Sequence, residues 1–403
     1  MPDQNYDLLI IGGGIAGASL AGAVARQGAK VVVLESETRF KDRVRGEAIM
    51  PWGVVDARAL GVYDVLVSAG AIPITYWDTY QGAERSGHRN VVDTAPLKEH
   101  ILDCYHPAMQ EALLQWAQDS GASVLRGARA RSLTTDGVNL VEIDGNEKSE
   151  SISARMVVGA DGRGSSVRSW AGFSVQKEPD RNLASGLLME NVDLSEDAAH
   201  TWLQTDLGYF AFFWPQGNGM ARVYFCYGSG PGSLPKLSGA GDIPRFLEGC
   251  QAAGVPSEVL SQAKAAGPLA TFDGAGAWTE IAFQQGVALI GDAASNSDPT
   301  WGQGLSMALR DARVLAQALA EHQDWDVAGN AYSVERNQYR QVIQTIEDWQ
   351  STVLMDVGPE ADSLRAKVLP SWRSDRSRHP DTFFAGPGAT LDEEARRRFF
   401  GED

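Results

Sequence analysis

The stretch Asp7-Leu8-Leu9-Ile10-Ile11-Gly12-Gly13-Gly14-Ile15-Ala16-Gly17 decides the fold of this chain. Residues 7–11 form a short apolar run, which is typical of a strand buried on both faces. Residues 15–27 are rich in alanine and predict a helix that Gly28 ends, and residues 30–35 predict the next buried strand. Strand, helix and strand in this order predict a βαβ unit with parallel strands.

Two later runs resemble this first strand. Residues 156–161 and residues 287–292 are mostly apolar, and each ends in a turn that contains glycine and aspartate. A long helix is predicted at residues 305–321, after the second run. Because each run leads from an apolar strand into a polar turn, we expect both to extend the same parallel sheet.

The segments between these strands have the pattern of antiparallel sheet. Residues 74–80 alternate and are rich in aromatic side chains, and residues 209–214 and 221–227 flank a turn that contains two glycines. Such a pair of runs predicts a β-hairpin. We therefore predict an α/β fold with three parts: a discontinuous Rossmann-like domain (1–73, 98–180 and 281–330), an inserted antiparallel-sheet domain (74–97 and 181–280) and a C-terminal helical tail (331–403).

Composition narrows the class of protein. Of the 403 residues, 43% are hydrophobic, which is enough for a large core and excludes a disordered chain. The formal net charge of −17 makes nucleic acid and anionic membrane surfaces poor partners. Three cysteines without a metal-ligand spacing indicate a reducing, cytoplasmic setting and no metal site. No apolar run reaches the roughly 18 residues of a membrane span.

The glycines Gly12, Gly14 and Gly17 form a Gly-x-Gly-x-x-Gly turn between the first strand and the first helix, and Glu35 ends the second strand. In this context the glycines permit a tight turn and let a pyrophosphate approach the N–H groups of the helix start. The Glu35 carboxylate suits a ribose diol. The motif predicts a bound dinucleotide and leaves open whether it is FAD or NAD.

Two further motifs lie at strand ends, where open α/β sheets bind their ligands. Asp161-Gly162 lies at the end of the third predicted strand (156–161), and Gly291-Asp292 lies at the end of the fourth (287–292). By itself, Asp161-Gly162 also fits a plain strand-to-helix connection. The segment Asp298-Pro299-Thr300-Trp301-Gly302-Gln303-Gly304 precedes the long helix, where its glycines let backbone N–H groups face an anion.

In this order and spacing, the three motifs resemble the FAD-binding signature of the para-hydroxybenzoate hydroxylase-like flavoprotein monooxygenases of group A, over residues 1–320. The run Arg43-Val44-Arg45-Gly46-Glu47 resembles the basic loop of that family, and Gln110 matches another FAD contact, although His106 stands near an expected arginine. The resemblance implies FAD as the cofactor, held by Gly12, Gly14, Ile15, Ala16, Gly17, Glu35, Arg45, Gln110, Asp161, Gly162, Gly291, Asp292, Pro299, Gly302, Gln303, Gly304 and Leu305.

The resemblance also implies a monooxygenase reaction. In this family NADH or NADPH reduces FAD, and O₂ then forms a flavin C4a-hydroperoxide that hydroxylates or epoxidises an aromatic or polycyclic small molecule, for example in secondary metabolism. The candidate catalytic residues are Arg45, His106, Pro299 and Trp301. We expect a monomer or a homodimer.

Such a reaction needs a site that excludes water until the oxygen is transferred. The aromatic residues of the inserted domain would line that site, although strand alternation allows only about half of each strand to face one side. The candidate substrate contacts are Tyr76, Tyr209, Phe212, Trp214 and Tyr224, and Trp77 and Tyr80 belong to the same aromatic runs.

Three other functions remain open at this point. Arg45-Gly46-Glu47, followed by Pro51, also resembles flavin-dependent halogenases and geranylgeranyl reductases, although the Trp-x-Trp-x-Ile-Pro run of halogenases is absent. A third alternative is a non-catalytic binding protein on the same fold, like the GDP dissociation inhibitors. Asp161, Asp292 and the segment 299–304 argue against that alternative, because only a complete flavin site needs them.

Overall fold

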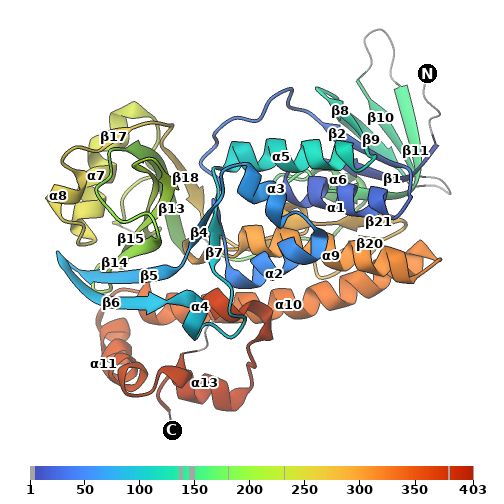
Figure 1. The fold of residues 1–403 in the computed structure, drawn as a ribbon. Coiled ribbons are helices and arrows are strands. Elements are labelled where there is room, and N and C mark those ends of the chain that lie inside the picture. Colours follow the sequence, from blue (N-terminus) through green and yellow to red (C-terminus); the bar gives the residue numbers. More distant parts are fainter. Residues whose placement is uncertain are drawn as a thin grey trace.

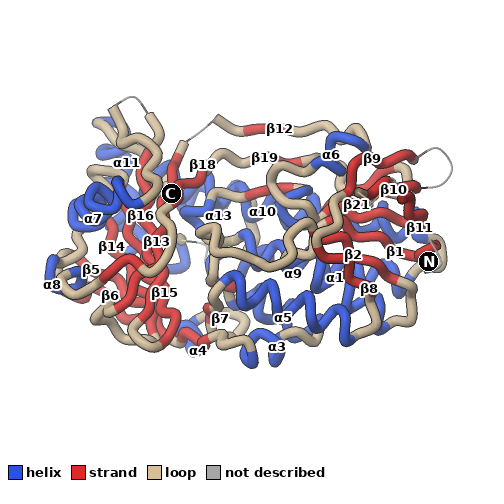
Figure 2. Tube along the Cα trace, turned by 90° about the horizontal axis from the view of Figure 1, so that it is seen from above, coloured by secondary structure: helices blue, strands red, loops and turns tan. Residues whose placement is uncertain are grey.

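The computed structural model describes residues 5–135, 139–144, 150–179, 181–230, 232–379 and 382–402. Two large sheets lie at opposite ends of the molecule, with a group of helices between them (Figures 1 and 2). Segments far apart in the sequence therefore meet in the middle of the molecule, where the candidate site lies.

The first large sheet is the predicted parallel sheet. Strand β1 pairs in parallel with both β11 and β2, and β11 pairs in parallel with β21. This confirms that the two later apolar runs return to the sheet of the first strand. The order across the sheet is β20 (Phe283–Gln284), β21 (Val287–Leu289), β11 (Glu150–Gly159), β1 (Asn5–Ile11), β2 (Val31–Glu35) and β8 (Ser123–Arg126), and β10 (Asn139–Ile143) and β9 (Ala130–Thr134) extend it beside β11.

Helices pack against this sheet and against one another. Helix α1 contacts both α5 and α9, and α9 also contacts α2 and α10. The approach of α1 to α5 is close, because a Cβ atom on Gly22 would lie 2.1 Å from the Trp116 ring. The helices are α1 (Ile15–Arg26), α2 (Pro51–Leu60), α3 (Tyr63–Ser68), α5 (His106–Asp119), α6 (Ser166–Trp170), α9 (Gly304–Glu321) and α10 (Trp325–Leu354).

The second large sheet contains the predicted hairpin. Strands β15 and β16 pair antiparallel, and β13 continues the antiparallel pairing. One pair differs, because β14 runs parallel to β5, which enters the sheet from a separate part of the chain. The order is β17 (Lys264–Ala265), β13 (Asn182–Glu190), β16 (Met220–Gly228), β15 (Tyr209–Gly217), β14 (Ala198–Gln204), β5 (Tyr76–Gln81) and β6 (Glu84–Asn90), and β18 (Ala270–Asp273) also pairs with β13.

Strands from the ranges 74–97 and 181–280 thus share one sheet, and the domain boundaries drawn from the sequence stay a prediction. Alternation along β15 divides its side chains between two hydrophobic cores. Phe210, Phe212 and Trp214 belong to the core that includes α1 and α9. Ala211 and Phe213 face the other way, into a core closed by α7 (Ile243–Ala252) and α8 (Ser257–Leu260).

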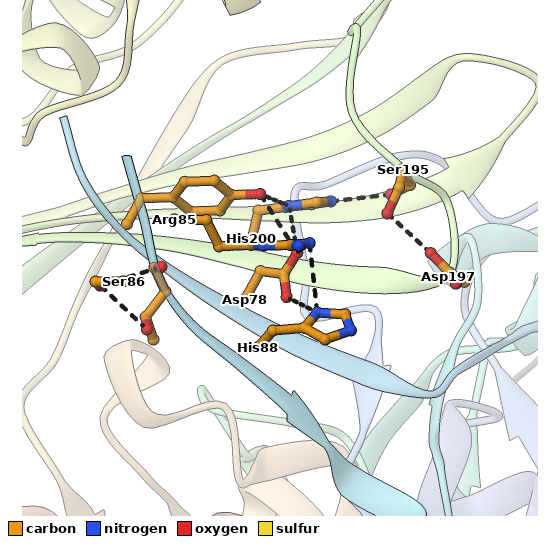
Figure 3. A network of polar contacts seen from close by, with 9 residues as sticks. Asp78, Arg85, Ser86, His88, Ser195, Asp197 and His200 are labelled. Carbon is orange, nitrogen blue, oxygen red and sulfur yellow. Dashed lines mark hydrogen bonds and ion pairs between the residues drawn. The ribbon is translucent and has the colours of Figure 1, made fainter. Parts of the chain in front are cut away.

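A polar network joins three strands at the outer part of this sheet (Figure 3). The Asp78 carboxylate of β5 accepts a hydrogen bond from His88 Nδ1 of β6 at 2.6 Å and forms an ion pair with Arg85 at 3.3 Å. His200 Nδ1 of β14 lies 3.0 Å from the Tyr80 hydroxyl. The network ties the parallel strand pair together, and Tyr76 stacks on His88 beside it.

Short elements complete the fold. Near the C-terminus, α11 and α13 form a small helical group at the lower left of Figure 1, with an apolar core that they share with the end of α10. No helix in the described part of the chain is both long enough and apolar enough to cross a bilayer. The remaining elements are β3 (Ala48–Ile49), β4 (Ile72–Ile74), α4 (Val91–Thr94), β7 (Ile101–Asp103), β12 (Gln176–Lys177), β19 (Ala277–Trp278), β22 (Ser295–Asn296), α11 (Pro359–Ser374), α12 (Thr382–Ala385) and α13 (Glu393–Phe399).

Candidate active site

Two neighbouring cavities occupy the space around the start of α1. The polar cavity, of about 320 Å³, is lined by the glycine turn, Glu35 and Asp161, and by basic side chains. The aromatic cavity, of about 270 Å³, is lined by Trp77, Phe212, Trp214 and Trp301. Both cavities share the lining residues Gly14, Arg45, Gln110, Ala160 and Gly162.

The three glycines of the turn have different roles. A Cβ atom on Gly12, whose φ is +107°, would lie 2.3 Å from the Ala160 carbonyl oxygen, and one on Gly17 would lie 2.0 Å from the Gly12 oxygen. These two glycines let helix and strand pack closely. A Cβ on Gly14 would meet only Gln110 Nε2, at 3.8 Å. Gly14 therefore leaves the N–H groups at the start of α1 open to the cavities.

Glu35 supports the turn from the end of β2. Its Oε2 accepts the Gly13 N–H at 2.8 Å, and its Oε1 accepts the Glu37 N–H at 2.7 Å. The residue is buried and still lines the polar cavity. Each carboxylate oxygen has a second lone pair, so Glu35 can brace the turn and also accept hydrogen bonds from ribose hydroxyls.

Asp161 has a local role that the sequence left open. Its carboxylate accepts hydrogen bonds from the Ser165 hydroxyl at 2.5 Å and from the Ser166 N–H at 2.7 Å, and so it caps α6. Gly162 has a φ of +79°, lines both cavities, and has no neighbouring atom within 4 Å of the place that a Cβ would take. The open backbone of Gly162 is therefore the part of this motif that a ligand can approach closely.

The segment before α9 forms one wall of the aromatic cavity. Asp298 accepts the Thr300 N–H at 2.9 Å and the Asn182 side-chain amide at 2.7 Å, which ties the segment to β13. Trp301 donates from Nε1 to Ser351 Oγ at 2.9 Å. Gln303 points away from the cavities: it accepts from Trp52 Nε1 and donates to the Trp301 carbonyl.

Asp292 comes shortly after the end of β21 and lines the aromatic cavity. Other predicted FAD contacts line the same cavity: Gly291, Pro299, Gly302, Gly304 and Leu305. Burial raises the pKa of the Asp292 carboxyl above its usual value, and the charges of Arg45 and Arg163 oppose that shift. The carboxyl therefore lies in a partly desolvated place with two cations near it. Such a group readily binds the hydroxyls of a sugar alcohol.

His106 contacts the backbone of the loop that carries Arg45. Arg45 is exposed and lines both cavities, whereas His106 is buried and its Nδ1 lies 2.7 Å from the Gly46 carbonyl oxygen. Because a carbonyl only accepts, Nδ1 carries the proton. Burial lowers the pKa of His106 to about 4, so the ring is neutral near pH 7. The geometry makes His106 a support for the Arg45 loop.

The aromatic residues predicted to contact the substrate lie on two opposite faces of the second sheet, as strand alternation requires. Phe212 and Trp214 of β15, Tyr224 of β16 and Trp301 line the aromatic cavity, together with Trp77, whose ring centroid lies 5.6 Å from that of Trp214. Tyr209 contacts Phe225 in the opposite core. Of the predicted site residues, all of which the structure describes, Gly17, Gln303, Tyr76 and Tyr209 line neither cavity.

Several lining residues were not predicted. Glu47, Met50, Arg163, Phe272 and Asn296 all line the aromatic cavity. Glu47 directly follows the basic loop in the sequence, so the motif itself carried that signal. Phe272 and Asn296 come from short strands, β18 and β22, that have no distinctive pattern.

The side chains and backbone groups of this pair of cavities suit FAD. The polar cavity has an open helix start, a ribose-binding carboxylate and the basic residues Lys41, Arg43 and Arg129 for a pyrophosphate. The adjoining aromatic cavity suits a flat apolar ring. The chain matches the family described as "FAD binding domain" over residues 5–345.

The chain belongs to this FAD-binding family. The match confirms the resemblance to the group A flavoprotein monooxygenases and confirms FAD as the cofactor. The flavoprotein is 28% identical to 3-demethoxyubiquinol 3-hydroxylase of Escherichia coli K12, over 85% of this chain and 87% of that one. It is 27% identical to digeranylgeranylglycerophospholipid reductase 1 of Methanococcoides burtonii, over 80% of this chain and 76% of that one.

A solved structure has the same fold. The flavoprotein superposes on p-nitrophenol 4-monooxygenase PnpA of Pseudomonas putida DLL-E4 with a TM-score of 0.76, over 89% of this chain and 92% of that one. The two sequences are 19% identical. The similarity therefore confirms the predicted α/β fold with its second sheet.

Proposed function

We propose that this flavoprotein is a monooxygenase that uses NADH or NADPH and O₂ to hydroxylate or epoxidise an aromatic or polycyclic small molecule. The observation that carries the proposal is the aromatic cavity, which shares lining residues with the polar cavity and is walled by Trp77, Phe212, Trp214 and Trp301. A flat apolar substrate would be held there directly beside the flavin ring.

Each part of the site has a defined task in this proposal. Bound FAD would supply hydride acceptance from NADH or NADPH and, when reduced, the activation of O₂. The backbone N–H groups at the start of α9, near Gly304, and the charged side chain of Arg45 would stabilise negative charge on the ring. Trp301 and Phe212 exclude water from the aromatic cavity, which oxygen transfer requires.

The cofactor contacts are proposed as predicted, with a change of role for three residues. Gly17 and Gln303 act through packing and hydrogen bonds behind the cavity wall, and His106 supports the Arg45 loop. Asp292 is the proposed partner of the ribityl hydroxyls. We further propose that the protein acts in the cytoplasm, as a monomer or homodimer, on substrates that are neither nucleic acid nor membrane.

A direct experiment is to purify the protein with its flavin and to follow NADH and NADPH oxidation with a panel of phenols. Oxidation that rises with one phenol, together with a product that contains one added oxygen atom, would support the proposal. Asp292→Ala should lower the FAD content of the purified protein strongly, and unchanged flavin content would contradict the assignment of Asp292.

The second candidate function is reduction of an unsaturated lipid, which the similarity to the digeranylgeranylglycerophospholipid reductase favours. Such an enzyme would transfer hydrogen from reduced flavin to a carbon–carbon double bond and would need no O₂. Turnover without oxygen, with a saturated product, would therefore identify the reductase instead of the monooxygenase.

A further inference from the structure

A buried ionic cluster lies behind the wall of the aromatic cavity. Arg222 of β16 is fully buried, and its Nε donates to Glu47 Oε1 at 2.8 Å while its Nη2 donates to Asp42 Oδ2, also at 2.8 Å. The single guanidinium is therefore shared by two carboxylates. Arg222 Nη1 has no partner among the described residues, but the side chain is fully buried and does not line the cavity, so a bound substrate does not reach this cation.

A third carboxyl group, that of Asp103, lies near the cluster. Asp103 of β7 is buried, receives one hydrogen bond from the Gln216 amide, and leaves its Oδ1 without a partner among the described residues. Burial, followed by the charge of Glu47, raises the pKa of Asp103 well above its usual value. Glu47 and Asp42 thus share one guanidinium, and the third carboxyl group beside them retains its proton to higher pH than an exposed aspartate.

Glu47 is the member of the cluster that reaches the cavity. It is buried and lines the aromatic cavity, and its Oε2 accepts the Tyr224 hydroxyl at 2.6 Å. Burial raises the pKa of Glu47 to about 7, against the opposing effect of Arg222 and Tyr224. Glu47 therefore gains negative charge as the pH rises through neutrality. The ionisable groups around it are Asp42, Arg45, Asp103, Cys104, Tyr105, His106, Arg222 and Tyr224.

Tyr224 presents this arrangement to the cavity. It pairs with Phe212 across the two strands, and both residues line the aromatic cavity. Its only hydroxyl proton points to Glu47 Oε2 at 2.6 Å, with the Arg45 carbonyl oxygen a more distant acceptor at 3.1 Å. The hydroxyl can therefore only accept a hydrogen bond from a ligand in the cavity.

Two other cations line the same cavity and need to be considered. The Arg163 guanidinium donates to the carbonyl oxygens of Asp273 and Ala275, at 2.6 and 3.2 Å. Arg45 lines the polar cavity as well, so it lies where the two cavities meet. Neither cation belongs to the β15–β16 wall that carries Tyr224.

We propose that Glu47 and Tyr224 determine substrate selectivity: they accept a hydrogen bond from a hydroxyl or amino group of an uncharged aromatic substrate, and they exclude a carboxylate. This inference rests on the proposed function and specifies its substrate class. A carboxylate offers only acceptor atoms, so at Tyr224 it would face lone pairs, and behind them the carboxylates of Glu47 and Asp42, which share one guanidinium. Arg222, the one cation of this wall, is already neutralised by Glu47 and Asp42.

The test is a binding experiment with the flavin-loaded protein and three matched probes: 2-naphthol, 2-naphthoate and naphthalene. Dissociation constants are read from changes in the flavin absorption spectrum at pH 7.5. We expect 2-naphthol to bind at least about tenfold more tightly than 2-naphthoate, because one probe donates a hydrogen bond and the other brings a buried negative charge. Equal binding of the two, or no binding of 2-naphthol, would overturn the proposal.

Two variants separate selectivity from a merely structural role. Tyr224→Phe should weaken 2-naphthol about tenfold, to the level of naphthalene. Tyr227→Phe is the matched control, because the Tyr227 hydroxyl bonds to Ser185 and Pro235 in the other core, and it should change none of the three constants. Loss of 2-naphthol binding in both variants, or in neither, would contradict the proposal.

The variant Glu47→Gln tests whether the pH dependence of substrate selectivity comes from Glu47. In the wild type the preference for 2-naphthol over 2-naphthoate should grow between pH 6 and 8, as Glu47 loses its proton. In Glu47→Gln this pH dependence should disappear, and an unchanged pH dependence would overturn the role of Glu47. Oxygen incorporation from NAD(P)H-dependent turnover tests the proposed function separately, so a monooxygenase with the opposite selectivity would refute this inference alone.

Discussion

The polar cavity and the aromatic cavity are built from different kinds of sequence. The glycine turn of the polar cavity belongs to one βαβ unit, in which Gly13 and Glu35 are hydrogen-bonded across only 22 positions of the chain. The wall of the aromatic cavity depends on pairs such as Glu47 and Arg222, which are 175 positions apart. Local motifs therefore form the proposed cofactor site, whereas long-range packing forms the cavity beside it.

The two cavities also treat charge differently. The protein has a formal net charge of −17, yet Lys41, Arg43 and Arg129 line the polar cavity, where an anionic pyrophosphate would lie. Behind the aromatic cavity the balance is reversed, because the carboxyl groups of Glu47 and Asp42 share the single guanidinium of Arg222. Net charge thus says little about either ligand, and the local arrangement decides.

The largest effect is expected where the turn of the polar cavity is tightest. Gly12→Ala introduces a Cβ at 2.3 Å from a backbone oxygen and at a positive φ, so it should cost roughly 5 kcal/mol and abolish FAD binding. Gly164→Ala, in the wall of the same cavity with no atom near its Cβ position, is the control. Thermal unfolding and flavin absorbance measure both effects, and a flavin-loaded Gly12→Ala protein would contradict the account.

The next prediction uses neighbours on β15 that face opposite ways. Phe213→Ala should destabilise the protein by about 4 kcal/mol, since the side chain is fully buried in the second core, and should leave the KM of an aromatic substrate unchanged. Phe212→Ala should raise that KM about tenfold, because its ring lines the cavity. The alternation of the two faces would be refuted if both variants had the same KM.

A third prediction concerns the Arg45 loop. In the folded protein the pKa of His106 is about 4, so the ring stays neutral until the pH falls near that value. In the unfolded chain the same ring takes up its proton near pH 6.5. Above pH 6.5 the neutral His106 therefore contributes about 3 kcal/mol to the free energy of unfolding, and this contribution is lost as the pH falls towards 4. In His106→Asn the loss of unfolding free energy between pH 7 and pH 4 should be smaller by that amount. An equally steep loss in the variant would show that His106 does not contribute.

The smallest effect is expected at the edge of the aromatic cavity. Ser351→Ala removes the acceptor for Trp301 Nε1 at 2.9 Å, so it should cost about 1 kcal/mol of unfolding free energy. Ser374→Ala serves as the control, because its exposed hydroxyl donates only to a helix carbonyl. Equal midpoints of chemical unfolding for the two variants would count against the Trp301–Ser351 bond.

The same contrast explains how far sequence reasoning reached. The parallel strands, the hairpin and the FAD-binding family were predicted correctly, because apolar runs and glycine spacings are local signals. Tyr209 and Gln303 lie outside both cavities, which the sequence does not show, since the face that a strand or loop presents depends on what packs against it. Tyr76 stacks on His88, a partner that becomes evident only once β5 and β6 pair.

The pairing of Glu47 with Arg222 had no local signal at all. Glu47 follows a basic loop, and Arg222 stands in an aromatic strand whose pattern predicts only a hairpin. The meeting of the β2–β3 connection with β16 is what reveals that the arginine is neutralised. Substrate selectivity is therefore the part of the function for which the structure was needed most.

The proposed reaction, in which reduced flavin held across the two cavities passes oxygen to a substrate in the aromatic cavity, is tested most directly with isotopically labelled O₂. The purified protein is supplied with NADPH or NADH, ¹⁸O₂ and the phenol that most stimulates cofactor oxidation, and the product is examined by mass spectrometry. The account predicts a hydroxylated product that carries one ¹⁸O atom per nicotinamide oxidised. A product that forms equally well without oxygen, or that contains no ¹⁸O, would contradict it.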